Sequence, residues 1–443
     1  MNKTFKYRIY PTEEQKTLIN KTIGCCRKVY NELFQDTETQ YRETGKFKVK
    51  PYTEIRKKYD FMKEVDAQAL NYTRLYLDRA YKEFFKSNNG KRKSSVGKPR
   101  LKPWVSYGSY TTYISNCIDN SKYLKHGNLY IPKVGEIKIK WHRKFEGQIK
   151  HLTISRTPSQ EYYVSICTEV KYDLPPKKDI TLESKVLGID MAMNQGGIYS
   201  DGTSMNIPDF TKKYKRKLAH LQRELSRRQG ARKGEEKSSN FRKTQLKINR
   251  LYRNMVNERT DFLNKESHKI SDTYDAVVIE DINLQIMALK KNKKKSPDDK
   301  KPINKKKCFR FGKSIGNNAF GEFKCMLQYK LDRTGGTLVK AKQNKDFASS
   351  QICSNCGEKN PLVKDLSVKS WKCPSCGYDH NIIINGVQHG RDYNAAKNLK
   401  NYIFSEKKIV NIKSIVPRLL REFMPMEGLE VERTCSGTET SVK

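Results

Sequence analysis

Four cysteines in two closely spaced pairs are the residues of this sequence whose chemistry is easiest to infer. Cys353, Cys356, Cys373 and Cys376 follow the spacing C-x2-C-x16-C-x2-C. Each pair can direct two thiolates at one ion, and two pairs complete the tetrahedron of soft ligands that Zn²⁺ prefers. Because four protein ligands leave no position for water, the spacing predicts one structural Zn²⁺. An iron–sulfur cluster and a redox dithiol are the alternatives.

Acidic residues at the ends of two apolar stretches form a second candidate site. Asp190 ends "VLGID" and Glu280 ends "AVVIE", and both stretches predict buried strands. Carboxylates that converge at one edge of a sheet repel one another and attract divalent cations. A pair of Mg²⁺ ions held in this way can support phosphodiester cleavage. Taken singly, an acid at a strand end is usually a solvated residue or a helix cap, so spacing alone does not decide between that role and a metal site. Asp281 is a competing acid on the opposite face of the strand.

A third carboxylate could come from either of two aspartates near the second cysteine pair. Asp392, in "RDYNAAKNL", precedes a helix expected from about Tyr393, so it could also be the N-cap of that helix. Asp379, in "CGYDHN", could instead be a polar neighbour of the zinc site. Spacing alone does not choose between them.

Other catalytic schemes find no support. The sequence has no G-x-S-x-G elbow and no Walker A lysine, and its seven histidines form no H-E-x-x-H pattern. His380 and His389 flank the acidic and cysteine motifs, and we expect both on the surface.

The charge of the chain points to a polyanionic partner. Its 443 residues carry 89 Lys and Arg against 48 Asp and Glu, a formal net charge of +41. This excess is best neutralised by nucleic acid, whereas an anionic membrane surface would need a basic amphipathic helix that does not stand out. No apolar stretch approaches the roughly 20 residues of a membrane span, and the first residues lack a signal-peptide pattern. We therefore expect a cytoplasmic protein with no membrane partner, in which the seven other cysteines form no disulfide framework.

The first part of the chain alternates between strand and helix patterns. "KTFKYRIY" predicts a strand, and Thr12 and Gln15 are spaced as a capping box that opens a helix ending near Gly45. A second amphipathic run covers 70–85. From 104 to about 170 the sequence is rich in β-branched and aromatic residues. We predict a small β-barrel or sandwich from 1–10 and 100–175, with the helical region 11–99 inserted in it, and take the barrel as the more specific expectation.

The remainder predicts an α/β domain after a linker at 176–184. Strands are expected at the two acidic stretches and at "GTLVKAK", a basic helical hairpin at 210–270, a lysine-rich loop at 290–307 and a helix near 316–332. The predicted boundaries are 185–350 and 377–405 for this domain, 351–376 for the zinc-binding knuckles and 406–443 for a C-terminal tail.

Several motifs, taken in order, resemble one family. "VLGIDMAMNQGGIYSDG", "VVIEDIN", "SSQICSNCG", "WKCPSCGY" and "RDYNAAKNL" are similar to the motifs of the TnpB family of transposon-encoded nucleases, which is related to the compact type V CRISPR effectors. The start of the chain and "GKPRLKP" resemble the family more diffusely. The sequence departs from the family pattern at "NIIINGVQHG", an apparent insertion between the last cysteine and Asp392.

The resemblance implies a multidomain α+β protein. Its parts would be a RuvC nuclease domain of RNase H-like fold with a zinc-binding insertion, and a β-barrel wedge domain with a helical recognition insertion. It implies an RNA-guided endonuclease that uses two Mg²⁺, one structural Zn²⁺ and a guide RNA, and that cuts double-stranded DNA beside a short flanking motif. No small-molecule substrate is expected. Asp190, Glu280 and Asp392 correspond to the catalytic acids of the family.

Three other functions remain as alternatives. The chain could be a type V CRISPR effector, an RNA-guided DNA-binding regulator that does not cleave, or an accessory protein that binds transposon DNA. The last two functions fit less well, because all three motif acids are present.

Overall fold

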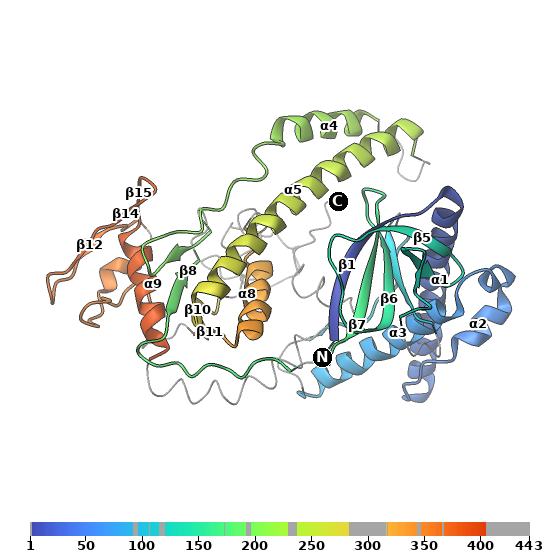
Figure 1. Cartoon of the computed structure of the whole chain (residues 1–443), viewed down its shortest axis with the longest axis horizontal. Helices are drawn as coiled ribbons and strands as arrows, with labels where there is room; N and C mark the ends of the chain where they lie inside the picture. Colours follow the sequence, from blue (N-terminus) through green and yellow to red (C-terminus); the bar gives the residue numbers. More distant parts are fainter. Residues whose placement is uncertain are drawn as a thin grey trace, which may run out of the picture. The chain divides into compact units, whose positions relative to one another are not determined.

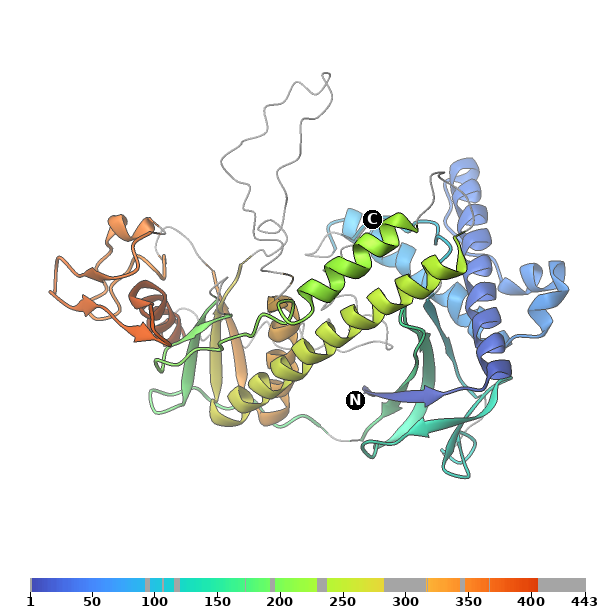
Figure 2. The same cartoon turned by 90° about the horizontal axis from the view of Figure 1, so that it is seen from above.

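The computed structural model divides the chain into two compact units, the first built mainly from 1–172 and the second mainly from 173 onward. Each unit is described by itself (Figures 1 and 2). The structure describes residues 2–91, 96–105, 107–114, 120–171, 173–191, 196–228, 237–282, 316, 318–342, 347–365 and 367–404.

The first unit contains an antiparallel sheet of seven strands in the order β2-β6-β7-β1-β5-β4-β3. The strands are β1 (Asn2–Tyr10), β2 (Gly108–Thr112), β3 (Leu124–Lys125), β4 (Asn128–Ile131), β5 (Gly135–Lys140), β6 (Gln148–Arg156) and β7 (Tyr162–Glu169). The first strand of the chain lies inside this sheet, paired with both β5 and β7. The sequence predicted a β-barrel. Among the described residues the hydrogen-bonded order instead ends at β2 and β3, which do not pair with each other.

Helices follow β1 directly in the chain. They are α1 (Glu13–Thr44), α2 (Tyr52–Lys58), the short 3-10 helix η1 (Asp60–Lys63) and α3 (Ala67–Asn88). The predicted capping box is present, because Thr12 accepts a hydrogen bond from the N–H of Gln15 while Gln15 accepts one from the N–H of Thr12. Gly45 ends α1 in the left-handed conformation (φ 65°), as predicted. Neither α2 nor η1 was predicted from the sequence.

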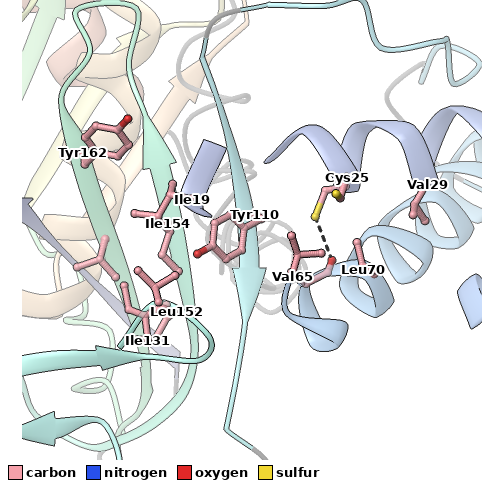
Figure 3. Packing of buried hydrophobic residues seen from close by; sticks show 14 of the residues in the cluster. Ile19, Cys25, Val29, Val65, Leu70, Tyr110, Ile131, Leu152, Ile154 and Tyr162 are labelled. Carbon is pink, nitrogen blue, oxygen red and sulfur yellow. Dashed lines mark hydrogen bonds between the residues drawn. The ribbon is translucent and has the colours of Figure 1, made fainter. Parts of the chain in front are cut away.

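The core of the first unit lies between these helices and the sheet. Ile19 and Val29 of α1 and Leu70 of α3 are buried in one cluster with Tyr110 of β2 and Ile154 of β6 (Figure 3). The apolar positions of α1 recur every three or four residues, so one face of the helix meets the sheet. The helical insertion and the β-strands therefore share one core.

A four-stranded sheet organises the second unit, in the order β11-β10-β8-β9. The strands are β8 (Val186–Asp190), β9 (Ile198–Tyr199), β10 (Ala276–Glu280) and β11 (Thr337–Ala341). The strands β8, β10 and β11 run parallel, and β9 is antiparallel to β8. The apolar stretches that end at Asp190 and Glu280 are thus neighbouring strands.

Helices cover both faces of this sheet. The covering helices are α5 (Ser239–Thr273), α8 (Phe320–Thr334) and α9 (Gly390–Tyr402), and a further helix, α4 (Lys215–Arg227), precedes α5 in the chain. Leu187 and Ile189 pack with side chains of α5 and α8 on one face. Val186 and Val278 pack with Leu399 of α9 on the other. Figure 1 shows α9 and α8 on opposite sides of the strands, which is the α/β arrangement that the sequence predicted.

The predicted basic helical hairpin is formed by α4 and α5. The two helices lie side by side in opposite directions (Figure 2) and are joined by the Lys213–Glu258 ion pair (2.8 Å) and an Arg228–Thr244 hydrogen bond (2.6 Å). Ser238 caps α5 by accepting a hydrogen bond from the N–H of Phe241.

The predicted linker at 176–184 contains no helix or strand and is attached to the second unit. Lys178 donates from its backbone N–H to the oxygen of Gly335 (2.8 Å) and forms an ion pair with Asp275 (2.6 Å). Lys177 forms an ion pair with Asp332. The predicted lysine-rich loop at 290–307 and the tail at 406–443 lie outside the described residues. None of the described helices is both long and apolar enough to cross a membrane.

Candidate active site and zinc centre

The register of β8 and β10 brings two of the predicted acids together. The strands are parallel, and Val278 pairs with Gly188 and Ile279 with Ile189. The next residues in this register are Asp190 and Glu280. Adjacent strands lie about 4.8 Å apart, and residues at matching positions of parallel strands project from the same face. Alternation along β8 places Asp190 on the face of Val186 and Gly188, which α9 covers.

A glycine in the middle of β8 allows α9 to lie very close to the sheet. A Cβ atom on Gly188 would be 2.0 Å from the backbone oxygen of Ala396 and 2.5 Å from the backbone nitrogen of Lys400. Only glycine fits this approach, because those atoms belong to the helix backbone and cannot turn aside. Asp392 lies one helical turn before Ala396 on α9, and Asp190 lies two residues beyond Gly188 on β8. Close helix–strand packing thus brings the third acid to the first.

The three carboxylates interact electrostatically. Burial raises the pKa of Asp190 well above its ordinary value, and Glu280 and then Asp392 raise it further. Arg391 and Lys369 act in the opposite direction. Asp190 is therefore within electrostatic reach of both other carboxylates. Among the described residues, only the four cysteine sulfurs form a metal-binding cluster of side-chain ligand atoms that all lie within 4.8 Å of one another.

Glu280 is held by residues from two other segments. The hydroxyl of Ser349 donates to Oε1 of Glu280 at 2.9 Å. Nζ of Lys324, on α8, donates to the backbone oxygen of Glu280 at 3.0 Å. Burial lowers the pKa of Lys324, and Asp281 and Glu280 partly offset this effect. A basic group therefore lies beside the acidic edge.

Two buried asparagines connect α9 to the loop that leads into the first cysteine pair. Nδ2 of Asn394 donates to the oxygen of Ile352 (2.7 Å), and Nδ2 of Asn398 donates to the oxygens of Ile352 (2.6 Å) and Ser349 (2.7 Å). Oδ1 of Asn394 accepts from the N–H of Ser354 at 2.8 Å. The segment that holds Glu280 through Ser349 is therefore tied to the helix that carries Asp392.

The four predicted zinc ligands come together as one cluster. Their Sγ atoms all lie within 4.8 Å of one another, and Cys356 and Cys373 are 3.7 Å apart. Each pair is followed by a glycine in the left-handed region, Gly357 (φ 80°) and Gly377 (φ 72°). The N–H of that glycine donates to the oxygen of the first cysteine of its pair, so two equivalent tight turns face one point. The donor set and its convergence fit one Zn²⁺.

The zinc-binding module is small. It contains η3 (Pro361–Lys364) and the short strands β12 (Trp371–Lys372) and β13 (Asp379–His380), which pair with each other. Trp371 and Val363 are buried with two of the cysteines. With so little apolar core, a module of this size usually needs a disulfide or a bound metal for its stability, and the four cysteines could supply a metal site.

The structure corrects the expectation that His380 and His389 lie on the surface, because both are buried. The ring of His380 stacks on Trp371 with centroids 4.1 Å apart, and its Nε2 lies 3.2 Å from Sγ of Cys353. Nδ1 of His389 lies 3.1 Å from Oδ2 of Asp392. The two histidines are buried by contacts between segments that are distant in the chain, and the periodicity of the sequence does not predict such contacts.

The positions of Asp379 and Asp392 in the structure favour Asp392 as the third carboxylate of the candidate site. Asp379 is exposed on β13, whereas Asp392 is within the electrostatic reach of Asp190. The helix α9 begins at Gly390, three residues earlier than expected, with His389 at the N-cap position. Asp392 is therefore the third residue of the helix and not its N-cap.

The inserted "NIIINGVQHG" forms a β-hairpin. Its strands β14 (Ile383–Ile384) and β15 (Val387–Gln388) are joined by Asn385 and Gly386, both at positive φ (52° and 76°). Asn-Gly is the preferred pair for such a two-residue turn, so the hairpin could have been predicted from the sequence but was not. Nδ2 of Asn385 donates to the hydroxyl of Ser204 at 2.9 Å. The extra residues thus form a separate hairpin before α9.

The residues that support the acids were not predicted from the sequence either. Asn394 and Asn398 are four residues apart, and two asparagines on one helical face beside buried alanines could have indicated a buried polar contact. No local pattern distinguishes Ser349, Lys324 or His389.

Models of known families match three parts of the chain. A helix-turn-helix domain model matches residues 1–46, a family described as "Probable transposase" matches 165–291, and a "Cas12f1-like, TNB domain" matches 320–399. The structure of the first segment is the strand β1 followed by the single long helix α1.

Curated relatives cover most of the chain. A protein of Streptomyces pristinaespiralis named "Putative RNA-guided DNA endonuclease" is 28% identical over 410 residues, which is 90% of this chain and 89% of that protein. The Escherichia coli protein named "Putative RNA-guided DNA endonuclease InsQ" is 26% identical over 394 residues, 87% of this chain and 90% of that protein. A TnpB-like protein of Acanthamoeba polyphaga mimivirus is 21% identical over 416 residues, covering 89% of this chain and 72% of its own length.

A solved Cas12f1–sgRNA–target DNA complex contains a chain that covers 90% of this chain and 99% of its own, at 14% identity and a TM-score of 0.43. The family is indicated by the matches in sequence and not by this structural comparison. With the transposase and TNB-domain matches and the relatives that span most of its length taken together, the chain is similar to proteins of the TnpB family.

Proposed function

We propose that this protein is an RNA-guided endonuclease that cleaves double-stranded DNA beside a short flanking motif. The observation that carries the proposal is the set of three acids on the α9 face of the second sheet, Asp190, Glu280 and Asp392. The names of the full-length relatives support the choice of reaction and of guide. The fold that we propose for this unit is the RNase H-like fold of RuvC nucleases, with the zinc module inserted between β11 and α9.

The carboxylate set fits divalent magnesium. Carboxylate oxygens are the ligands that Mg²⁺ prefers. Burial and then the charges of Glu280 and Asp392 raise the pKa of Asp190, and a bound cation would relieve that repulsion. We propose Asp190, Glu280 and Asp392 as the groups that would hold two ions. Such a pair activates a water molecule and stabilises the leaving oxygen of a phosphodiester.

The remaining residues of the site position the acids. Ser349 orients Glu280 by donating to Oε1, and the β8–β10 register sets the spacing between Asp190 and Glu280. The close contact at Gly188 keeps α9, and with it Asp392, against the sheet. The Cys353, Cys356, Cys373 and Cys376 cluster would hold a structural Zn²⁺ and, through Asn394 and Asn398, fix the loop before it.

Exposed basic residues on the α4–α5 hairpin supply a surface for nucleic-acid phosphates. On α4 and α5 they include Lys215, Arg216, Lys217, Arg227, Lys243, Lys247 and Arg250. Contacts of this kind give affinity without sequence information, so pairing with a guide would read the target.

The test is reconstitution with RNA from the locus that encodes the protein. The chain is purified together with that RNA and incubated with Mg²⁺ and a plasmid library in which the sequence flanking the target is randomised. We expect cleavage by the wild type and none by Asp190→Asn, Glu280→Gln or Asp392→Asn. Cleavage that persists in Asp190→Asn would falsify the assigned site.

Two neighbouring acids provide matched controls. Asp379→Asn and Asp281→Asn remove exposed carboxylates that adjoin the zinc module and β10, and we expect both variants to cleave. If the wild type binds DNA under RNA guidance but does not cleave it, the protein is a DNA-binding regulator and not a nuclease. If no RNA co-purifies with the protein, the part of the proposal that assigns a guide RNA is wrong.

A further inference from the structure

We infer that His389 is a positioning residue that orients Asp392 for metal binding by donating a hydrogen bond from Nδ1. The inference rests on the proposed function, because it assigns a role to a neighbour of one of the three acids. Nδ1 of His389 lies 3.1 Å from Oδ2 of Asp392, and the two side chains are 7% and 14% exposed. The contact is therefore shielded from solvent and from competing water.

A helix-capping role does not explain this histidine. His389 is the N-cap residue of α9, but its side chain accepts no hydrogen bond from the first turn of the helix. The N–H of Tyr393 donates to the backbone oxygen of His389 instead, at 2.8 Å. The ring faces the carboxylate, although a Ser, Asn or Asp at this position would cap the helix better.

Packing does not explain the choice of histidine either. Nε2 of His389 is buried and has no hydrogen-bond partner among the described residues. A buried polar nitrogen without a partner is unfavourable, and an apolar ring would fill the same space without this cost. The favourable polar contact is the one from Nδ1 to Asp392, so this contact is what distinguishes histidine from phenylalanine here.

The direction of the hydrogen bond follows from the chemistry of a ligand. A carboxylate that binds a cation is ionised and can only accept hydrogen bonds. Nδ1 must then be the donor of this hydrogen bond. A donor fixed on one carboxylate oxygen turns the other oxygen toward its ligand position, and partners of this kind typically change metal affinity by about 10- to 100-fold.

His389 also lies at the junction of two structural elements. It is the last residue before α9 and follows the β14–β15 hairpin directly, and its N–H donates to the oxygen of Ile382 at 2.9 Å. The backbone of His389 is thus held from the base of the hairpin as well as from the helix. The inserted segment therefore affects the proposed site, because the hairpin helps to determine the position of His389.

The experiment compares three substitutions in the guide-RNA complex. In His389→Asn the amide nitrogen can occupy the position of Nδ1, in His389→Gln it reaches the position of Nε2, and His389→Phe keeps the ring without a donor. The readouts are Mn²⁺ affinity, measured by paramagnetic resonance without DNA, and the Mg²⁺ concentration that gives half-maximal cleavage. We expect the Gln and Phe variants to weaken both by about tenfold or more and the Asn variant to remain within about threefold of the wild type.

His268→Gln is the matched control. His268 faces Asp272 at 3.3 Å on α5, but both side chains are exposed and neither belongs to the proposed site. We expect this variant to match the wild type in both readouts.

The outcomes separate the inference from the proposed function. If the wild type cleaves and the Gln and Phe variants bind Mn²⁺ as tightly as it does, His389 has no positioning role and the nuclease proposal stands. Equal weakening in the Asn, Gln and Phe variants would mean that the loss does not depend on a donor at the position of Nδ1, which also overturns the inference. A wild type that neither binds Mn²⁺ nor cleaves overturns the proposed function itself.

Discussion

Gly188 of β8 and Ala396 of α9 approach so closely that a single methyl group on the glycine would collide with the carbonyl oxygen of the alanine at 2.0 Å. This contact relates the strand that ends at Asp190 to the helix that begins just before Asp392. The geometry of the proposed active site therefore depends on a residue that has no side chain.

Gly188→Ala is expected to separate α9 from the sheet. The added Cβ meets backbone atoms, so the helix must move, and overpacking of this kind costs about 1–3 kcal/mol or more. We expect a lower urea-unfolding midpoint and a loss of cleavage larger than the loss of stability explains. Gly321→Ala is the control, because a Cβ atom at this position inside α8 would meet no atom within 4 Å. Alanine should be neutral or stabilise that helix by up to about 1 kcal/mol. Wild-type cleavage by Gly188→Ala would contradict the role of this contact.

Removal of zinc is expected to lower cleavage although zinc is not at the acidic site. The first cysteine pair is connected to α9 by Asn394 and Asn398, whose amides hold the backbone of Ile352 and Ser349. Chelation should loosen these contacts and the Ser349–Glu280 hydrogen bond with them. We expect cleavage and the melting temperature to fall together after chelation and to recover with added Zn²⁺.

Asn398→Leu should reproduce part of this loss while zinc stays bound. The substitution removes one of the two amide donors to the oxygens of Ile352 and Ser349, the other being Asn394, and each lost hydrogen bond contributes about 0.5–1.5 kcal/mol. Asn401→Leu, at an exposed position of the same helix, is the control. If zinc content measured by atomic absorption falls in Asn398→Leu, the asparagine acts on the zinc module itself and not between the two sites.

The basic face of α4 is expected to bind phosphate groups. Replacement of Lys215, Lys217 and Arg227 by Gln should weaken binding of RNA or DNA similarly for all sequences. The slope of log K against log salt should fall by about 0.7–0.9 for each phosphate contact that is lost. The charge-conserving variants Lys215→Arg, Lys217→Arg and Arg227→Lys should keep the slope. An unchanged slope in the Gln variant would remove α4 from the binding surface.

Stability of the first unit is expected to fall in acid through Glu38. Burial alone would raise the pKa of this carboxyl, but hydrogen bonds from Lys98 (2.6 Å) and from Tyr81 outweigh it and hold the pKa below its ordinary value. A lowered pKa means that the unfolded chain binds the proton more tightly. The stabilisation is therefore complete above the unfolded pKa of about 4.3 and is lost as the pH falls through the folded pKa.

Glu38→Gln tests this dependence. At pH 7 the variant should be less stable by about 1.5–3 kcal/mol, the range for hydrogen bonds to a charged group, and the difference from the wild type should shrink below about pH 4. Asp60→Asn is the control, because its Lys63 partner is on the surface and such pairs contribute little. A difference that does not change with pH would rule out the Glu38 carboxylate as its source.

Local features of the sequence were enough for several of these elements. The capping box at Thr12 and Gln15, the end of α1 at Gly45 and the strands that end at Asp190 and Glu280 were all predicted correctly. Each is specified by residues within one or two turns or along a single strand, so its physical cause is visible in a short window.

Contacts between segments that are distant in the chain were not predictable in this way. The burial of His380 and His389, the asparagine contacts of α9 and the open edges of the first sheet depend on packing partners that no local periodicity identifies. The Asn-Gly turn of the β14–β15 hairpin is different, because its signal was present and was overlooked.

Residue types and their spacing were enough to predict the ligand chemistry of this protein: two cysteine pairs for one zinc, acids at the ends of apolar strands for divalent cations, and a positive charge for a polyanion. Which of those acids meet, and what supports them, became clear only in the folded chain. Parallel register placed Asp190 beside Glu280, and the missing side chain of Gly188 let α9 bring Asp392 to the same face. The reason is physical, since residue types set what a group can bind, whereas close packing between distant segments sets where that group stands.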